Sequence, residues 1–235
     1  MAPDRLKAPD PLKALDDLAE HEYGVYSQSG EDGVLLRLFE SIGVQDRFFV
    51  EFGAWDGLHL SNTANLRLHH GWTGLLMEDS DSADGRLVQR ERVDAENVNR
   101  LFGKYDVPRR FDLLAIDIDG NDYWVWKAIE GFTARVVLIE YNVFFAPRMS
   151  RTMPYDPDHV WDQSFYHGAS LAALRKLGDE KGYALVHTDR WAPNAFFVLR
   201  SELPADFVDR PIEEITPWNS FIEAAPIDGR EWQIV

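Results

Sequence analysis

The chain contains no cysteine among its 235 residues. This absence excludes disulfide bonds, zinc sites built from thiolates and cysteine nucleophiles. Long apolar runs are also missing, and the N-terminal stretch MAPDRLKAPDPLKALDD lacks the apolar core of a signal peptide. From these absences we expect a soluble, cytoplasmic protein.

Positive charge is scarce as well. The chain has 24 Lys and Arg against 40 Asp and Glu, which gives a formal net charge of -16. A surface this acidic repels phosphate backbones and anionic lipids, so we expect neither a nucleic-acid partner nor a membrane partner. A small-molecule substrate is compatible with the charge, because a pocket can differ from the average surface. The sequence leaves the oligomeric state open, a homo-oligomer included.

What the chain does contain is enough apolar sequence for a folded domain, since 45% of its residues are hydrophobic. Strand-like apolar runs alternate with helical patterns, which predicts right-handed crossover units and a mostly parallel sheet. The last two runs are separated only by RWAP, too short for a helical crossover, so they should pair as an antiparallel hairpin. The runs are RFFVEF, TGLLMED, FDLLAIDID, RVVLIEYN, YALVHTD and NAFFVLR.

The helical patterns fit between these runs. GEDGVLLRLFESIG has one apolar face and ends at Gly43, a typical C-cap residue. Further helices are predicted at AENVNRLFGKY, VWKAIEGF and ASLAALRKLGDEKG, and a short one begins at Asp10 and Pro11. The predicted fold is α/β and Rossmann-like, with seven strands of which the last is antiparallel. We expect an N-terminal tail and helix over residues 1–25, the main domain over 26–203 and a C-terminal extension over 204–235.

The turn after the first strand, FFVEFGAWDGLHLSNT, points to a ligand site. Ligands of open α/β sheets bind beyond the carboxyl ends of the strands, and Gly53 and Gly57 allow a sharp turn and close backbone approach. Glu51 and Asp56 offer acceptors that suit an ammonium or a ribose hydroxyl and would repel a pyrophosphate. Glu78 ends the second run at close to the spacing of about 20 residues at which an acid binds ribose. The turn therefore favours S-adenosylmethionine over a dinucleotide.

Four stretches together resemble successive blocks of class I S-adenosylmethionine-dependent methyltransferases of the FkbM-like family: YSQSGEDGVLLRLF, FFVEFGAWDGLHLSNTANL, GWTGLLMED and LLAIDIDGNDYWVWKAI. The resemblance covers Tyr26 to Arg200, which is most of the chain. It departs from the family at residues 117–120, which read DIDG where the family commonly reads DVEG. The residues that the resemblance assigns to the cofactor are Gln28, Glu51, Gly53, Ala54, Gly57, Glu78, Asp94, Ala95 and Asp117.

Oxygen-bearing side chains gather near the carboxyl ends of two adjacent central runs, FDLLAIDID and RVVLIEYN, at Asp117, Asp119, Asp122, Glu140 and Asn142. Asp117 and Asp119 share a face if their strand extends that far. Crowded carboxylates repel one another, and a bound cation or proton relieves the repulsion. Oxygen donors suit magnesium or calcium rather than zinc, so Asp117, Glu140 and Asn142 are candidate Mg²⁺ ligands. The alternative is that these groups cap helices or bind cofactor and substrate directly.

A long insertion, residues 143–168, contains further candidates. His167 is a candidate general base together with Asp117, although a capping or surface histidine is the alternative. Tyr155, Trp161 and Tyr166 could cover a substrate or pack in the core. We expect methyl transfer to an oxygen of a small hydroxylated molecule, a sugar or a secondary metabolite. The alternatives are a nicotinamide-dependent oxidoreductase, for which the GxGxxG pattern is absent, and a non-catalytic S-adenosylmethionine-binding protein.

Overall fold

The structure is a computed structural model, and it describes residues 15–190, 193–216 and 229–235. The predicted helix that begins at Asp10 and Pro11 starts outside the described residues. Within them, the N-terminal segment contains a short 3-10 helix, η1 (Leu18–His21), whose Leu18 is buried.

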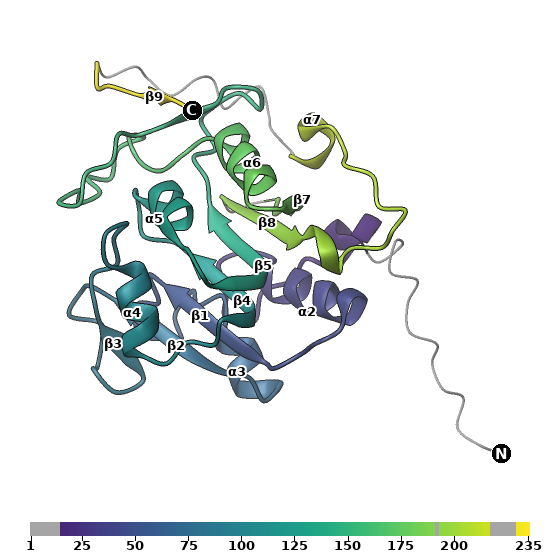
Figure 1. The fold of residues 1–235 in the computed structure, drawn as a ribbon, viewed down its shortest axis with the longest axis horizontal. Coiled ribbons are helices and arrows are strands. Elements are labelled where there is room, and N and C mark those ends of the chain that lie inside the picture. The colour runs from purple at the N-terminus through teal and green to yellow at the C-terminus, as the bar shows by residue number, and fades with distance from the viewer. Residues whose placement is uncertain (1–14, 191–192, 217–228) are drawn as a thin grey trace.

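A seven-stranded sheet forms the centre of the molecule, in the order β3-β2-β1-β4-β5-β8-β7 (Figure 1). Strands β1 to β5 pair in parallel, whereas β8 pairs antiparallel with both β5 and β7. This confirms the predicted Rossmann-like α/β fold and its C-terminal hairpin. The strands are β1 (Phe48–Phe52), β2 (Thr73–Glu78), β3 (Val88–Arg90), β4 (Arg110–Ile116), β5 (Thr133–Glu140), β7 (Tyr183–Thr188) and β8 (Asn194–Leu199).

Helices cover both faces of the sheet (Figure 1). Side chains of α4, α5 and α6 pack with one set of strand residues, and those of α2 and α3 pack with the alternate set. Burial on both faces explains why the strand sequences are almost continuously apolar. Among the described residues, no helix has the length and apolar character that a bilayer crossing requires. The helices are α2 (Glu31–Ile42), α3 (Ala64–His69), α4 (Val98–Lys104), α5 (Asp122–Ala128), α6 (Leu171–Glu180), α7 (Ile212–Ile215) and the 3-10 helix η2 (Arg200–Glu202).

The structure differs from the sequence-based expectation at the end of β4. The run FDLLAIDID predicts a strand through Asp119, but β4 ends at Ile116 and Asp119 adopts a left-handed backbone with φ 57°. The condition under which Asp117 and Asp119 would share a strand face is therefore not met. The strand stops because Asp122 accepts hydrogen bonds from the N–H groups of Ile118 and Gly120, which begins the turn into α5.

Two further pairings were not predicted from the sequence. Strand β3 is only three residues long and two of them are polar, so its pattern is too weak to recognise. A separate two-stranded sheet joins β6 (Arg151–Thr152) in the insertion to β9 (Gln233–Ile234) near the C-terminus. The insertion is therefore tied to the end of the chain.

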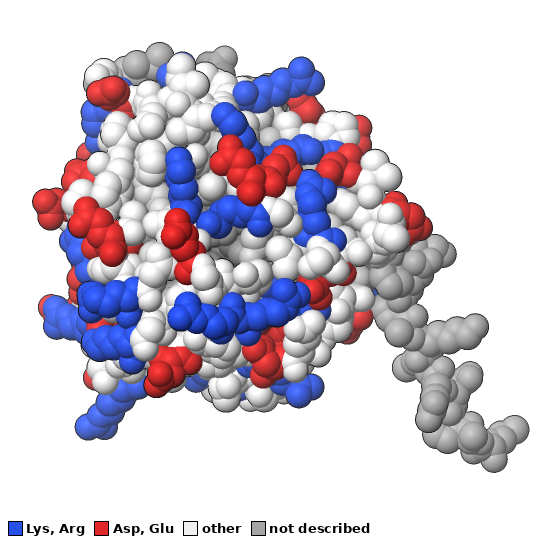
Figure 2. Space-filling view, in the orientation of Figure 1, with Lys and Arg blue, Asp and Glu red and all other residues white. Residues whose placement is uncertain are grey.

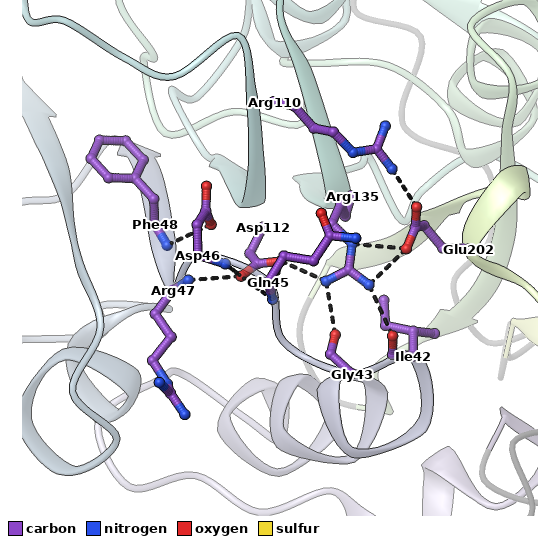
Figure 3. Close-up of polar contacts among 10 residues, drawn as sticks. All are labelled: Ile42, Gly43, Gln45, Asp46, Arg47, Phe48, Arg110, Asp112, Arg135 and Glu202. Atoms are coloured by element: carbon purple, nitrogen blue, oxygen red, sulfur yellow. Dashed lines mark hydrogen bonds and ion pairs between the residues drawn. The ribbon is translucent and has the colours of Figure 1, made fainter.

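A buried ion cluster holds the amino ends of the central strands (Figure 3). Arg135 on β5, 1% exposed, donates to Asp112 Oδ1 on β4 at 2.6 Å and to Glu202 Oε2 at 2.7 Å. It also donates to the carbonyl oxygens of Ile42 and Gly43, where α2 ends. Asp112 in turn accepts from the backbone N–H groups of residues 45–47, which lead into β1. One guanidinium and one carboxylate thus connect α2, β1, β4, β5 and η2.

The cluster should contribute strongly to stability. Replacing Arg135 with methionine leaves Asp112 and Glu202 without their cationic partner, and breaking a buried pair in this way costs about 3–5 kcal/mol. Arg110→Gln is the matched control, because Arg110 contacts Glu202 from an exposed position and such pairs contribute at most about 1 kcal/mol. Urea denaturation at neutral pH should separate the two variants. Similar losses in both would contradict the central role of Arg135.

The penalty of Arg135→Met should also depend on pH. Burial alone would raise the pKa of Asp112, but Arg135 and the N–H groups of residues 45–47 outweigh burial and leave this pKa below its usual value. A carboxyl with a lowered pKa stabilises the fold above its unfolded-state pKa of about 3.9 and loses that contribution as the pH falls through the folded-state value. The difference in stability between wild type and Arg135→Met should therefore shrink in acid.

Candidate functional site

A cavity of about 710 Å³ opens at the carboxyl edge of the parallel strands. This volume lies within the range of small-molecule sites, roughly 300–1,000 Å³. Its wall includes residues from the loops after β1, β2, β4 and β5, from the loop before α2 and from the insertion. The sequence analysis predicted a ligand site at this edge of the sheet, and the structure has a cavity there.

Gly53 begins the turn after β1 and is closely surrounded by backbone. Its φ is +72°, and a Cβ at this position would lie 1.6 Å from the carbonyl oxygen of Asp117. The N–H of Ala54 donates to the carbonyl of Met77 at the end of β2. The turn is thus held between β2 and β4. Glycine is required here for the sharp turn, as predicted from the sequence, and also for close contact with the backbone of β4, which was not predicted.

Glu51, on β1, is 2% exposed and does not line the cavity. Its carboxylate accepts hydrogen bonds from the Ser61 hydroxyl at 2.9 Å, from the Asn62 N–H at 2.8 Å and from the Thr63 hydroxyl. Burial raises the pKa of Glu51, and these donors partly offset the rise. The acid fixes the SNT segment before α3, and it is Asn62 of this segment that reaches the cavity wall.

The YSQSGED segment is held in a similar way. Asp32 accepts hydrogen bonds from three consecutive backbone N–H groups of the preceding loop and from the Ser27 hydroxyl. Glu31 accepts from the N–H of Ser29 and from the side-chain amide of Asn194 on β8. These contacts fix the loop that carries Gln28, which lines the cavity.

Glu78 lines the cavity at the end of β2. Its carboxylate accepts hydrogen bonds from the backbone N–H groups of Trp55 at 3.1 Å and Ser80 at 2.8 Å, which hold it in place. Other residues assigned to the cofactor are absent from the wall. Gly57 has a φ of +74° and packs near Val88. Asp94 accepts hydrogen bonds from the N–H groups of Glu96 and Asn97, just before α4, and Ala95 follows it in the chain.

Three carboxylates meet on the floor of the cavity. One oxygen each of Asp117, Asp119 and Glu140 lies within 4.8 Å of the others. Burial raises the pKa of Asp117 and of Glu140 well above the ordinary values, and neighbouring acids raise both further. Asp122 is also buried, but its carboxylate accepts the backbone N–H groups of Ile118 and Gly120 in the turn before α5. We call Asp117, Asp119 and Glu140 the acid cluster.

Asn142 does not join the acid cluster. Its side-chain amide donates to the carbonyls of Phe165 at 2.8 Å and His167 at 2.9 Å, and its oxygen accepts from the N–H of Phe144. The side chain therefore anchors the two ends of the insertion. Of the three predicted metal ligands, the structure brings Asp117 and Glu140 together and adds Asp119 in place of Asn142.

His167 lies behind the acid cluster. It is 8% exposed, and its Nδ1 is 3.8 Å from Glu140 Oε2. Burial lowers the pKa of His167, opposed in part by Asp122 and Asp119, so burial favours the neutral ring. The histidines on the wall are instead His59 and His159. His159 packs so closely over Gly120 that a Cβ there would lie 2.5 Å from its ring.

Several wall residues were missed by the sequence analysis. Trp55, with a φ of 48°, is one of them and is 52% exposed at the cavity. Of the aromatic residues named from the sequence, Trp161 lines the cavity and is 42% exposed, whereas Tyr166 packs against Trp232. Asn194 reaches the wall because β8 pairs with β5, which no local pattern reveals. The missed wall residues used below are Asn62, His159 and Asn194.

Comparisons with known proteins add no assignment. No protein-family model matches the chain, and no curated protein matches it. The functional interpretation therefore depends on the cavity and on the residues around it.

The contact at Gly53 can be tested by adding one methyl group. Gly53→Ala places its Cβ against the Asp117 carbonyl, so the ends of β1 and β4 must separate and the protein should be destabilised. Gly85→Ala is the matched control, because Gly85 has a φ of +69° but open space around it. The control should lose about 1–2 kcal/mol from backbone strain alone. Urea denaturation should show a clearly larger loss for Gly53→Ala, and equal losses would contradict this account of the turn.

Proposed function

We propose that this protein is an S-adenosylmethionine-dependent methyltransferase that acts on an oxygen of a small hydroxylated molecule. The observation that carries the proposal is the charge of the cavity. Six acidic residues line it: Glu78, Asp79, Glu91, Asp117, Asp119 and Glu140. The outer surface is different, since acidic and basic side chains are interspersed over the face in Figure 2.

The negative charge of the cavity wall distinguishes between S-adenosylmethionine and a dinucleotide such as NAD. Arg92 is the one Arg or Lys among the described wall residues, and its guanidinium is engaged by Asp79 and by the carbonyls of Pro157 and His159. The pyrophosphate of a dinucleotide would find mainly carboxylates here. S-adenosylmethionine carries a sulfonium and an ammonium, and both are attracted to such a wall. The cavity therefore favours S-adenosylmethionine over NAD.

The sheet order supports one orientation of the cofactor. An acid at the end of the second strand, Glu78, suits the ribose hydroxyls. Adjacent strands are about 4.8 Å apart, so a cofactor that extends from β2 across β1 reaches β4 after about 10 Å. Its methionine end would then lie near Asp117 and Gln28. The acceptor would enter beside β5 and the insertion, where Glu140, His159 and Trp161 lie.

The residues of the chain would contribute alignment and proton removal. A cavity that holds donor and acceptor in line lowers the barrier to displacement at the methyl group. Asp117 and Glu140 face the cavity, and a carboxylate whose pKa is raised is a better general base at neutral pH than an ordinary one. His167, whose Nδ1 is 3.8 Å from Glu140 Oε2 and whose burial favours the neutral ring, is the second candidate base.

Isothermal titration with S-adenosylmethionine and with NAD tests the proposal. We expect binding of the first ligand only, and Glu78→Ala should weaken it by about 1.5–3 kcal/mol, the scale of a charge-assisted hydrogen bond. Asp81→Ala is the control, because Asp81 lies close along the chain but pairs with Arg90 at the surface. Unchanged affinity in a folded Glu78→Ala variant would contradict the ribose assignment. Binding without methylation of any hydroxylated acceptor would instead indicate a non-catalytic binding protein.

A further inference from the structure

Three buried oxygens of the cavity wall find no hydrogen-bond donor among the described residues: one belongs to Asn62, and the other two lie on neighbouring strands. The two on neighbouring strands are Glu140 Oε2 and Asn194 Oδ1, from side chains that are 9% and 2% exposed. Leaving a buried polar group unpaired costs about 1–3 kcal/mol, so a ligand that satisfies both atoms would be favoured. The group nearest to Glu140 that could carry positive charge is the His167 ring, whose Nδ1 is 3.8 Å away, beyond hydrogen-bonding distance.

The two oxygens are neighbours by the register of the sheet. Glu140 on β5 is the direct partner of Asn194 on β8, and directly opposed residues in an antiparallel pair place their side chains on the same face. The amide nitrogen of Asn194 donates to Glu31 at 2.8 Å. A carboxylate can only accept, so this contact fixes the amide oxygen on the side away from Glu31. Both residues line the cavity.

Asp117 and Asp119 complete a set of oxygens that contains no donor. One oxygen each of these residues and of Glu140 lies within 4.8 Å of the others. Asp119 holds its position through a left-handed backbone with φ 57°, which persists only where the surrounding structure enforces it. Three carboxylates therefore converge on one region of the cavity, and Asn194 lies beside one of them, Glu140, in the sheet.

We propose that Asp117, Asp119 and Glu140 bind one hard divalent cation, Mg²⁺ or Mn²⁺, with the Asn194 amide oxygen beside it. An all-oxygen donor set is the one these ions prefer. An ammonium group would neutralise only one of the three carboxylates, whereas a divalent ion neutralises two. Compared with the ligands predicted from sequence, Asp119 and Asn194 replace Asn142.

The ion site stands on these contacts alone, whereas its use in catalysis rests on the proposed function. Next to Asp117 the ion would lie between the methionine end of the cofactor and the acceptor. A divalent ion in that position orients a hydroxyl group and lowers its pKa. With the ion bound, Asp117 and Glu140 act as its ligands and not as the base.

Direct titration of the chelator-treated full-length protein with MnCl₂, followed by electron paramagnetic resonance, tests the site. We expect one Mn²⁺ per chain, displaced by MgCl₂. Asp119→Asn and Glu140→Gln should each weaken binding at least tenfold. Asp158→Asn, which removes a charge from the insertion outside the cavity wall, should change it less than twofold. A uniform small effect of all three variants, or no binding at millimolar Mn²⁺, would overturn the proposal.

Two further measurements separate this proposal from its rivals. If methylammonium raises the melting temperature of the chelated protein more than Mg²⁺ does, the oxygens form an amine subsite and the ion proposal is wrong. S-adenosylmethionine should still bind the chelated protein, because its adenosine is held at Glu78. Failure to bind S-adenosylmethionine while Mn²⁺ still binds would overturn the proposed function and leave the ion site standing.

Discussion

The arrangement of the central strands depends on the contacts of the Arg135 side chain. Its guanidinium, almost completely buried, joins Asp112 on β4 to Glu202 and to the carbonyls that end α2. Through Asp112 it also orders the backbone that enters β1. The amino ends of β1, β4 and β5 are therefore fixed by charges that are paired and hydrogen-bonded. A local set of contacts sets the position of three strands at once.

The opposite ends of the same strands carry charges that are not paired in this way. Asp117 follows β4 and Glu140 ends β5, and burial with mutual repulsion raises the pKa of both carboxyls. Such groups destabilise a fold unless a ligand neutralises them, and perturbed carboxyls of this kind cluster at functional sites. Three of the non-glycine residues with positive φ, Trp55, Leu60 and Asp119, also line this cavity. Unpaired charge thus gathers at one edge of the sheet, while paired charge stabilises the other.

Local sequence patterns predicted much of the fold and part of the site. The alternation of apolar runs and helices predicted the sheet, and the short RWAP connection predicted the β7–β8 hairpin. Gln28, Gly53 and Glu78 were predicted at the cavity, and all three line it. The site residues that were predicted wrongly or missed depended on contacts that no apolar pattern reveals. Asp119 turns away from the strand because Asp122 stops β4, and Asn194 meets Glu140 only through strand pairing. The sequence predicted that Glu51 contacts the cofactor. In the structure Glu51 is buried, and its carboxylate accepts hydrogen bonds from a hydroxyl and an N–H group before α3.

The central claim is that this cavity holds S-adenosylmethionine with its methionine end facing the acid cluster. A crystal structure with S-adenosylhomocysteine tests it most directly, because it locates each part of the ligand. The account predicts the ribose hydroxyls at the Glu78 carboxylate and the sulfur on the side of Asp117. A ligand bound in the reverse direction, or outside the cavity, would contradict it.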